Sequence, residues 1–342
     1  MRPYIPYMVQ NTHAMKHILN KIIERQPLLF TEAKEIIYAI AEQKINDAQI
    51  VAILVGLQMR GLQLEEIKGF REALLELCLP INIDGSDAID LCGTGGDNKN
   101  TFNISTTTSF VLASMGHKVI KHGNYGVSSL CGSSNVLEEL GFKFTSDVNL
   151  LNKQLKETNI CFLHAPLFHP TLMKVGPLRK NLGIRTFFNS LGPLVNPVQP
   201  KHQLTGTFNL ELAKIYQHIL KEERKGYRIV YGMDVYDEFT LTDQTRILGG
   251  DIDEYLNANS FGLNPINPID LYSGESVQEA ASILKNILSG KGTESQNNVI
   301  AANTALALQC YKPEESIQSL FSSSLEFIKS GEAGRIHFSN IK

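Results

Sequence analysis

The pattern of apolar residues changes at Pro80, and this change constrains the fold more than any other feature of the chain. From Met15 to about Cys78 the apolar residues recur at the i, i+3, i+4 spacing of amphipathic helices, which predicts four consecutive helices without a strand. After Pro80, short apolar runs alternate with helical segments, as in βαβ units with a mostly parallel sheet. We therefore expect an α/β protein with a small N-terminal helical domain and a larger α/β domain.

Turn and capping residues give approximate bounds for these elements. In the helical part, Thr31 is expected to cap the second helix and Asn46 with Asp47 the third, which ends near Gly61. The expected domains are an N-terminal arm over 1–14, a helical domain over 15–80 and an α/β domain over 81–342. Strands are predicted at 88–92, 118–121, 160–164 and 228–231, and the later helices at 105–115, 133–140, 171–181, 210–221, 277–288, 298–309 and 313–329.

The composition of the 342 residues favours a small-molecule substrate. Thirty-two Lys and Arg against 35 Asp and Glu leave a net charge of −3, which provides no positive field for nucleic acid or an anionic membrane. The five cysteines are scattered and never form C-x-x-C, so neither a disulfide framework nor a structural zinc site is expected. No apolar run approaches the ~20 residues of a membrane span, and no secretory signal is recognised, so a cytoplasmic protein is expected.

The stretch Leu91-Cys-Gly-Thr-Gly-Gly-Asp97 follows a predicted buried strand. Glycines at such a position let main-chain N–H groups approach an anion closely, which would make the loop a phosphate cradle. The G-x-G-x-x-G pattern of dinucleotide sites is not satisfied, because position 98 is Asn, and no G-K-[ST] of a Walker A loop follows. On these residues alone the loop is either a phosphate cradle or an ordinary turn.

Two further segments place polar groups beside this loop. The segment Thr101 to Ser109 brings hydroxyl groups and one amide to the start of a helix, whose free N–H groups favour an anion. In Lys121-His-Gly-Asn124, the lysine ends a predicted parallel strand and should face the crevice where α/β proteins bind ligands. His122, without an identifiable acidic partner, is more simply interpreted as a packing residue.

The remaining candidates are cations and acids further along the chain. Arg179 and Arg185 lie in an apolar segment rich in Gly, Pro and Asn, and either could bind a carboxylate or be an ordinary surface charge. Asp237 and Glu238 follow a predicted strand. Adjacent acids are common on protein surfaces, but their position favours a Mg²⁺ site, since one or two carboxylates typically hold that ion with water and phosphate.

Together these segments resemble the anthranilate phosphoribosyltransferase family of the tryptophan pathway. The resemblance rests on GTGGD, N-x-S-T, KHGN, GIRTFFNSLGPLVNP and the acidic pair, in the family's order and spacing, and it covers nearly everything from Met15 onward. It implies a small helical domain joined by a hinge to the α/β domain, with the active site between them. It also implies that a segment around 177–197 returns to the helical domain, and that the protein is a homodimer through that domain.

The implied reaction displaces pyrophosphate from C1 of 5-phosphoribosyl-1-diphosphate (PRPP) by the amino group of anthranilate, without a covalent intermediate. Mg²⁺ is the implied cofactor, and neither nucleic acid nor a membrane is an expected partner. The resemblance assigns PRPP contacts to Gly93, Gly96, Asp97, Thr101, Asn103, Ser105, Thr106, Lys121, Ser129 and Ser133. It assigns anthranilate contacts to Gly93, Asn124 and Arg179, and Mg²⁺ ligation to Ser105, Asp237 and Glu238.

Two positions depart from the family pattern. Tyr125 follows Asn124 where many members carry Arg, and Asn98 stands where Gly is frequent.

Two alternative functions remain open at this point. A pyrimidine nucleoside phosphorylase shares this architecture, but the KHGN and FFNSLGPLVNP stretches resemble the transferase. A non-catalytic nucleic-acid-binding relative should have a basic face and lack the metal-binding acids, whereas this chain is slightly acidic and keeps both.

Overall fold

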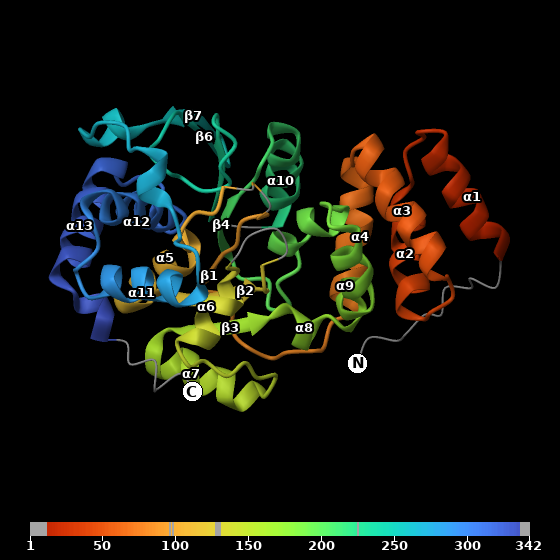
Figure 1. The fold of residues 1–342 in the computed structure, drawn as a ribbon, viewed down its shortest axis with the longest axis horizontal. Helices are drawn as coiled ribbons and strands as arrows, with labels where there is room; N and C mark the ends of the chain where they lie inside the picture. The colour runs from red at the N-terminus through yellow and green to blue at the C-terminus, as the bar shows by residue number, and fades with distance from the viewer. Residues whose placement is uncertain (1–11, 96, 98, 127–130, 224–225, 336–342) are drawn as a thin grey trace. The chain divides into compact units, whose positions relative to one another are not determined.

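The structure, a computed structural model, describes residues 12–95, 97, 99–126, 131–223 and 226–335. The chain divides into two units (Figure 1). The first contains the N-terminal residues up to Cys78 together with His169–Leu191, and the second contains Leu79–Phe168 and the chain from Gly192 onward. The helical unit is therefore built from two separate segments of the sequence, and the chain passes from one unit to the other three times.

All the secondary-structure elements among the described residues of the first unit are helices, and the four consecutive helices predicted from the sequence are confirmed. Asn46 accepts a hydrogen bond from the Gln49 N–H at 2.9 Å and caps the third helix as expected. The expected cap at Thr31 is wrong. The helix begins at Phe30, with Leu29 as its N-cap, which is two residues earlier than a cap at Thr31 implies. The Glu32 carboxylate accepts from the Leu29 N–H at 2.7 Å and satisfies the helix start. The helices are α1 (Thr12–Ile23), α2 (Phe30–Ala41), α3 (Asp47–Arg60), α4 (Leu64–Glu76) and α9 (Pro170–Leu182).

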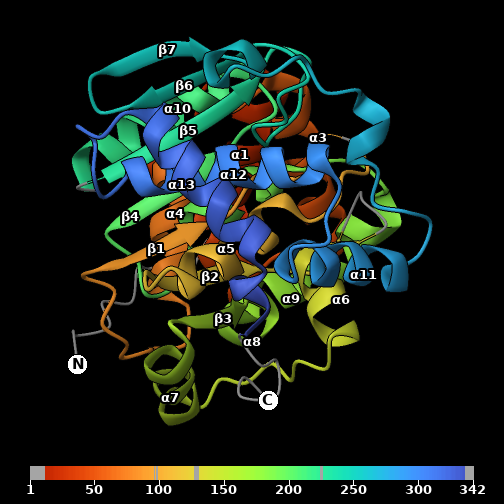
Figure 2. The ribbon, with the colours of Figure 1, turned by 90° about the vertical axis from the view of Figure 1, so that its left-hand side faces the viewer.

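The second unit contains a seven-stranded sheet of order β3-β2-β1-β4-β5-β6-β7, which Figure 2 shows from edge to edge. The five strands from β1 to β5 are parallel, and β6 and β7 are antiparallel, so the predicted mostly parallel sheet is confirmed. The carboxyl ends of the parallel strands therefore meet at one edge. The strands are β1 (Ala88–Leu91), β2 (Lys118–Gly123), β3 (Ile160–His164), β4 (His202–Gly206), β5 (Gly226–Gly232), β6 (Thr245–Gly249) and β7 (Ile252–Leu256).

Helices cover this sheet. Their bounds are α5 (Ile104–Ser114), α6 (Ser133–Glu139), α7 (Val148–Thr158), α8 (Ala165–Phe168), α10 (Leu210–Glu223), α11 (Val277–Leu288), α12 (Glu294–Gln309) and α13 (Ile317–Ser330). The sequence interpretation gave no element at α7, whose N-terminus is capped by Asp147. Within the described residues, no helix combines the length and the apolar character that a membrane span requires.

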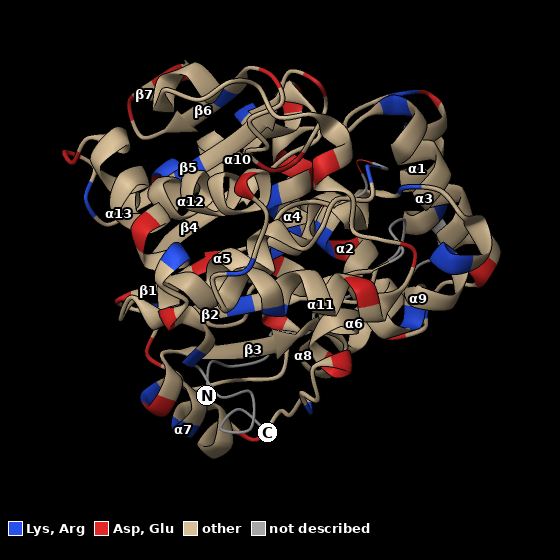
Figure 3. Cartoon of the chain, turned by 60° about the vertical axis from the view of Figure 1, so that its left-hand side comes forward, with Lys and Arg blue, Asp and Glu red and all other residues tan. Residues whose placement is uncertain are grey.

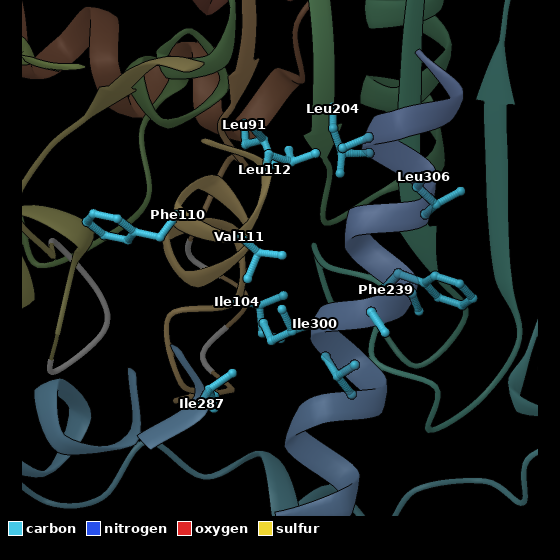
Figure 4. Close-up of a cluster of buried hydrophobic side chains, with 14 of the residues drawn as sticks. Leu91, Ile104, Phe110, Val111, Leu112, Leu204, Phe239, Ile287, Ile300 and Leu306 are labelled. Atoms are coloured by element: carbon cyan, nitrogen blue, oxygen red, sulfur yellow. The ribbon is translucent and has the colours of Figure 1, made fainter. Parts of the chain in front are cut away.

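The core follows from the two-residue period of the strands. Val119 belongs to a large apolar cluster that also contains residues of α5 and α12, whereas its neighbour Ile120 belongs to a second cluster with Leu151 of α7. Successive strand residues thus pack on opposite faces of the sheet. Figure 4 shows the large cluster around α5 and α12. This packing on both faces fixes the strands whose carboxyl ends carry the polar groups described next.

Candidate functional site

The loop after β1 and the segment after β5 meet at the carboxyl end of the sheet. The Gly95 N–H donates to Asp237 Oδ2 at 2.5 Å, and the Thr94 hydroxyl donates to the same oxygen at 3.4 Å. A Cβ added to Gly93 would lie 2.8 Å from that oxygen, and one on Gly206 would lie 1.5 Å from the Asp237 main-chain oxygen. Glycine is therefore required at both positions because the acidic segment passes so close.

A second contact joins Glu238 to the start of α5. The Ser105 N–H donates to Glu238 Oε1 at 3.3 Å. Lys121 lies within β2, which continues two residues beyond the predicted end at this lysine. It donates from Nζ to the Ser105 hydroxyl at 3.4 Å and to the main-chain oxygen of Leu91. Only 2% of the lysine is exposed. Ser105, Lys121 and the two acids, which the sequence analysis singled out separately, thus lie in one site.

The two acids carry charges that their surroundings disfavour. Burial raises the pKa of Asp237 well above its usual range, and repulsion from Asp97 and Glu238 adds to this effect. Burial also raises the pKa of Glu238 to about 7, although the positive charge of Lys121 opposes the shift. A divalent cation between these carboxylates would remove the repulsion that burial makes costly.

The oxygen donors present fit a magnesium ion. Across the residues that the structure describes, no group of three or more His, Cys, Asp or Glu side chains could hold a metal on its own. Mg²⁺ does not need such a group, because it usually takes one or two carboxylates and completes its coordination with water and substrate phosphates. Asp237, Glu238 and the Ser105 hydroxyl form a donor set of this kind.

The N-terminus of α5 carries several of the predicted PRPP contacts, namely Asn103, Ser105 and Thr106. Asn103 is the N-cap residue, but its side chain makes no capping hydrogen bond. Its Nδ2 donates to the Cys131 main-chain oxygen at 3.1 Å, while its buried Oδ1 accepts no hydrogen bond from any described residue. Thr106 follows in the first turn and is buried. Thr101 is held before the helix by an isolated bridge to Tyr272. The helix start is therefore fixed by contacts other than its own capping groups.

KHGN comprises the last three residues of β2 and Asn124, and this end of the strand is tied to the start of α6. The Asn124 main-chain oxygen accepts from the Ser134 N–H at 3.2 Å and from the Ser133 hydroxyl at 3.3 Å. Tyr125, where many family members carry Arg, donates from its hydroxyl to Glu138 Oε1 at 2.7 Å. Asn124 and Ser133, assigned above to different substrates, are thus in direct contact.

His122 is a buried packing residue, as the sequence interpretation favoured. Its ring Nδ1 donates to the Gly192 main-chain oxygen at 3.0 Å, and its main-chain N–H donates to Asp90 Oδ1 at 3.1 Å. Burial lowers the pKa of the ring to about 4. The imidazole is therefore neutral at physiological pH.

Arg179 belongs to the helical unit, in the last turn of α9. Its Nη2 donates to Asn189 Oδ1 at 3.0 Å, and its guanidinium lies 5.6 Å from the centre of the Phe188 ring. Its Nε, which is buried, makes no hydrogen bond with the described residues. Burial lowers the pKa of Arg179 to about 10, so the side chain remains charged at neutral pH. The guanidinium is thus held in place with donor capacity to spare.

Two of the predicted PRPP contacts, Gly96 and Ser129, lie outside the described residues, as does Asn98.

The sequence interpretation missed Asp90 and Asn196, which are both buried. The Asn196 amide donates to Asp90 Oδ2 at 3.0 Å and, at 2.9 Å, to the main-chain oxygen of Ile120, the β2 residue directly before KHGN. An acid within the apolar run of β1 is the signal that could have revealed this pair.

The match to known families covers both units. Residues 85–334 match the glycosyl transferase family, a/b domain, and residues 16–78 match the glycosyl transferase family, helical bundle domain. Among curated relatives, the anthranilate phosphoribosyltransferase of Christiangramia forsetii is 48% identical over 93% of this chain and 96% of its own length. That of Flavobacterium psychrophilum is also 48% identical, with the same shares covered.

Solved structures show the same similarity. The anthranilate phosphoribosyltransferase of Thermus thermophilus superposes with a TM-score of 0.84 at 29% identity, over 92% of this chain and 95% of the other. That of Saccharomyces cerevisiae, in complex with PRPP and Mg, superposes with a TM-score of 0.86 at 26% identity, over 97% of both chains. A complex of the yeast protein with 4-fluoroanthranilate superposes with a TM-score of 0.83 at 25% identity, again over 97% of both chains.

Proposed function

This chain belongs to the anthranilate phosphoribosyltransferase family, and from that premise we propose how its residues perform the family's reaction. It transfers the phosphoribosyl group of PRPP to the amino group of anthranilate in tryptophan biosynthesis and releases pyrophosphate. The observation that carries the proposal is the convergence of Asp237 with the glycine loop, and of Glu238 with Ser105 and Lys121. The carboxyl end of the sheet thus brings together two acids, a lysine and the start of a helix. This combination of groups is suited to binding a sugar diphosphate.

The diphosphate of PRPP would bind at this edge. Main-chain N–H groups of the glycine loop and of the first turn of α5, apart from those of Gly95 and Ser105 that donate to the acids, would donate to phosphate oxygens. Lys121 would add a fixed positive charge. Asp237, Glu238 and Ser105 would hold Mg²⁺, which neutralises the charge of the leaving pyrophosphate when it is bound. The Asn103 Oδ1, which accepts no hydrogen bond from the described residues, is suited to a ribose hydroxyl. Gly96, Asp97, Thr101, Thr106, Ser129 and Ser133 complete the proposed PRPP contacts.

Anthranilate would be held by its carboxylate. The guanidinium of Arg179 can present two parallel N–H donors to a carboxylate, and Gly93 and Asn124 would contact the rest of the molecule. The amine nitrogen then forms a bond to C1 of the ribose as the bond from C1 to the pyrophosphate oxygen breaks, and the nitrogen loses a proton. The protein contributes alignment and charge stabilisation, and it forms no covalent bond to either substrate.

Homodimerisation through the helical unit is part of the proposal. Five large apolar side chains are exposed among the described residues of this unit, namely Ile23 (76%), Leu29 (63%), Met59 (76%), Met173 (60%) and Ile184 (45%). Exposed apolar groups of this size are suited to burial against a partner. Light scattering at assay concentrations should give twice the mass of the chain, and the mass of one chain would reject the dimer.

A cytoplasmic location is likewise proposed for this biosynthetic enzyme.

The two alternatives receive less support. A pyrimidine nucleoside phosphorylase would share the fold, but the relatives reported above are anthranilate phosphoribosyltransferases over almost the whole chain. Nucleic-acid binding is disfavoured because acidic and basic residues are interspersed along the described chain, as Figure 3 shows, and the net charge is −3.

One assay separates these functions. The protein is offered anthranilate, PRPP and Mg²⁺ in one reaction, and thymidine or uridine with phosphate in another. Fluorescence follows the consumption of anthranilate in the first reaction, and chromatography follows the release of the free base in the second. We expect turnover only in the first reaction, and loss of that turnover when Mg²⁺ is chelated. Turnover only with a nucleoside and phosphate would establish the phosphorylase instead.

A further inference from the structure

Asn303 lies in the middle of α12, and its carboxamide binds the main chain directly after the two acids. Its Nδ2 donates to the Phe239 main-chain oxygen at 2.7 Å, and its Oδ1 accepts from the Phe239 N–H at 3.4 Å. The same Nδ2 also donates to the Val299 main-chain oxygen of its own helix at 2.8 Å. Only 1% of Asn303 is exposed. Figure 4 shows Phe239 beside α12.

The segment that carries the acids has an unfavourable backbone conformation. Val235 has a φ of +73° and Leu241 a φ of +62°, a region that branched and bulky residues rarely adopt. The ends of the segment are held by main-chain hydrogen bonds, from Gly232 N–H to the Tyr236 oxygen and from Ile266 N–H to the Leu241 oxygen. Phe239 lies between these ends, where Asn303 supplies both a donor and an acceptor. A strained segment needs such contacts to keep a single conformation.

We propose that Asn303 is a positioning residue for the magnesium site. A carboxamide offers a donor and an acceptor side by side, as a neighbouring strand would. By binding both main-chain groups of Phe239, it fixes Glu238 against Ser105, and Asp237 against the glycine loop, from the far side of the segment. The inference rests on the proposed function, because it assigns Asn303 to the acids that would bind Mg²⁺.

The hydrogen bonds of Asn303 to Phe239, outside its own helix, distinguish a positioning role from simple helix packing. α12 is buried along most of its length. Thr304, the next residue, is equally buried, but its hydroxyl donates to the Ile300 main-chain oxygen within the same helix, at 2.7 Å. Thr304→Val is therefore a matched control. It removes a buried polar group from the same turn of the helix and leaves the contact with Phe239 intact.

The test is calorimetric titration of PRPP into the full-length protein at a series of fixed Mg²⁺ concentrations, without anthranilate. The variants are Asn303→Leu, Asn303→Ser and Thr304→Val, each checked for folding by circular dichroism. We expect the Mg²⁺ concentration that gives half-maximal PRPP binding to rise about tenfold or more in both Asn303 variants, as is usual when a group supporting metal ligands is removed. It should remain at the wild-type value in Thr304→Val.

Three outcomes would overturn the proposal. An unchanged Mg²⁺ requirement in a folded Asn303 variant would show that the contact with Phe239 does not position the acids. If neither Asn303 variant folds while Thr304→Val does, the residue serves the fold rather than the metal site. If the wild-type protein shows no Mg²⁺-dependent binding of PRPP, the proposed function fails as well, which separates that failure from the first two outcomes.

Discussion

The main-chain N–H of Gly95 and the carboxylate of Asp237 are joined by a 2.5 Å hydrogen bond, although 142 residues separate them in sequence. The sheet brings them together because β1 and β5 both pair with β4, so that their carboxyl ends lie at the same edge. The glycine loop and the acidic pair, each an ordinary feature by itself, thus form one site.

The close approach of Gly93 to Asp237 gives a first prediction. In Gly93→Ala the new Cβ would lie 2.8 Å from Asp237 Oδ2, so the carboxylate or the loop must move. We expect kcat/KM for PRPP to fall about a hundredfold, a typical cost of misplacing a catalytic constellation by about 1 Å. Steady-state kinetics at saturating Mg²⁺ measures this loss. Gly192→Ala is the control, because a Cβ there meets no atom within 4 Å, and a comparable loss in that variant would reject the explanation.

Removal of either buried acid should change activity and stability in opposite directions. Burial and mutual repulsion raise the pKa of both Asp237 and Glu238, so their charges disfavour the folded state in the absence of metal. We expect Asp237→Asn and Glu238→Gln to unfold at a higher temperature than the wild type when Mg²⁺ is absent. Their Mg²⁺ requirement for activity should rise at least about tenfold. Melting curves with EDTA and metal titrations of the rate test both statements, and an unaltered titration would remove these residues from the site.

Arg179 should affect one substrate selectively. The Arg179→Ala variant loses the guanidinium proposed to bind the carboxylate of anthranilate, so we expect KM for anthranilate to rise about tenfold to a hundredfold while KM for PRPP changes little. Arg179→Lys should recover only part of the loss, since an ammonium cannot form the same paired hydrogen bonds. Lys180→Ala, which removes the adjacent exposed cation, is the control. Equal increases in both KM values would contradict the assignment of Arg179 to anthranilate.

His122 should contribute to the loss of stability in acid. In the folded protein burial lowers the pKa of its ring to about 4, whereas an unfolded chain binds the proton near pH 6.5. Between these two pKa values the unfolded state binds more protons than the folded state. The free energy of unfolding therefore decreases as the pH falls. His122→Asn keeps a donor for the Gly192 oxygen but does not titrate. Between pH 7 and pH 5 we expect the variant to lose about 2 kcal/mol less than the wild type in urea unfolding. If the two proteins lose equal amounts of stability, a group other than His122 causes the loss of stability at low pH.

The sequence predicts those parts of the fold whose pattern is local. The period of apolar residues located the four N-terminal helices, and β3 and α11 were predicted with the bounds that the structure has. Three strands were missed. β4 begins with His202 and Gln203 rather than with an apolar run, and the middle of β7, Asp253 to Tyr255, is exposed at the edge of the sheet. Such strands are defined by their partners rather than by their own residues.

The candidate site could be predicted only in part, for a related reason. The residue pattern singled out the glycine loop, the lysine and the acids, and the resemblance to a family gave them their roles, but each of these segments alone has an ordinary structural explanation. Asn303 and Asn196 were missed because an isolated amide in the sequence gives no sign of the main-chain groups that it binds. Those partners, Phe239 and Ile120, come from distant segments and are recognised only once the chain is folded.

A crystal structure of the protein grown with PRPP and Mg²⁺ would test the central claim most directly. We expect density for the diphosphate between the glycine loop and the start of α5, with the metal coordinated by Asp237, Glu238 or both. Well-ordered PRPP bound elsewhere, or a metal without contact to either acid, would contradict it.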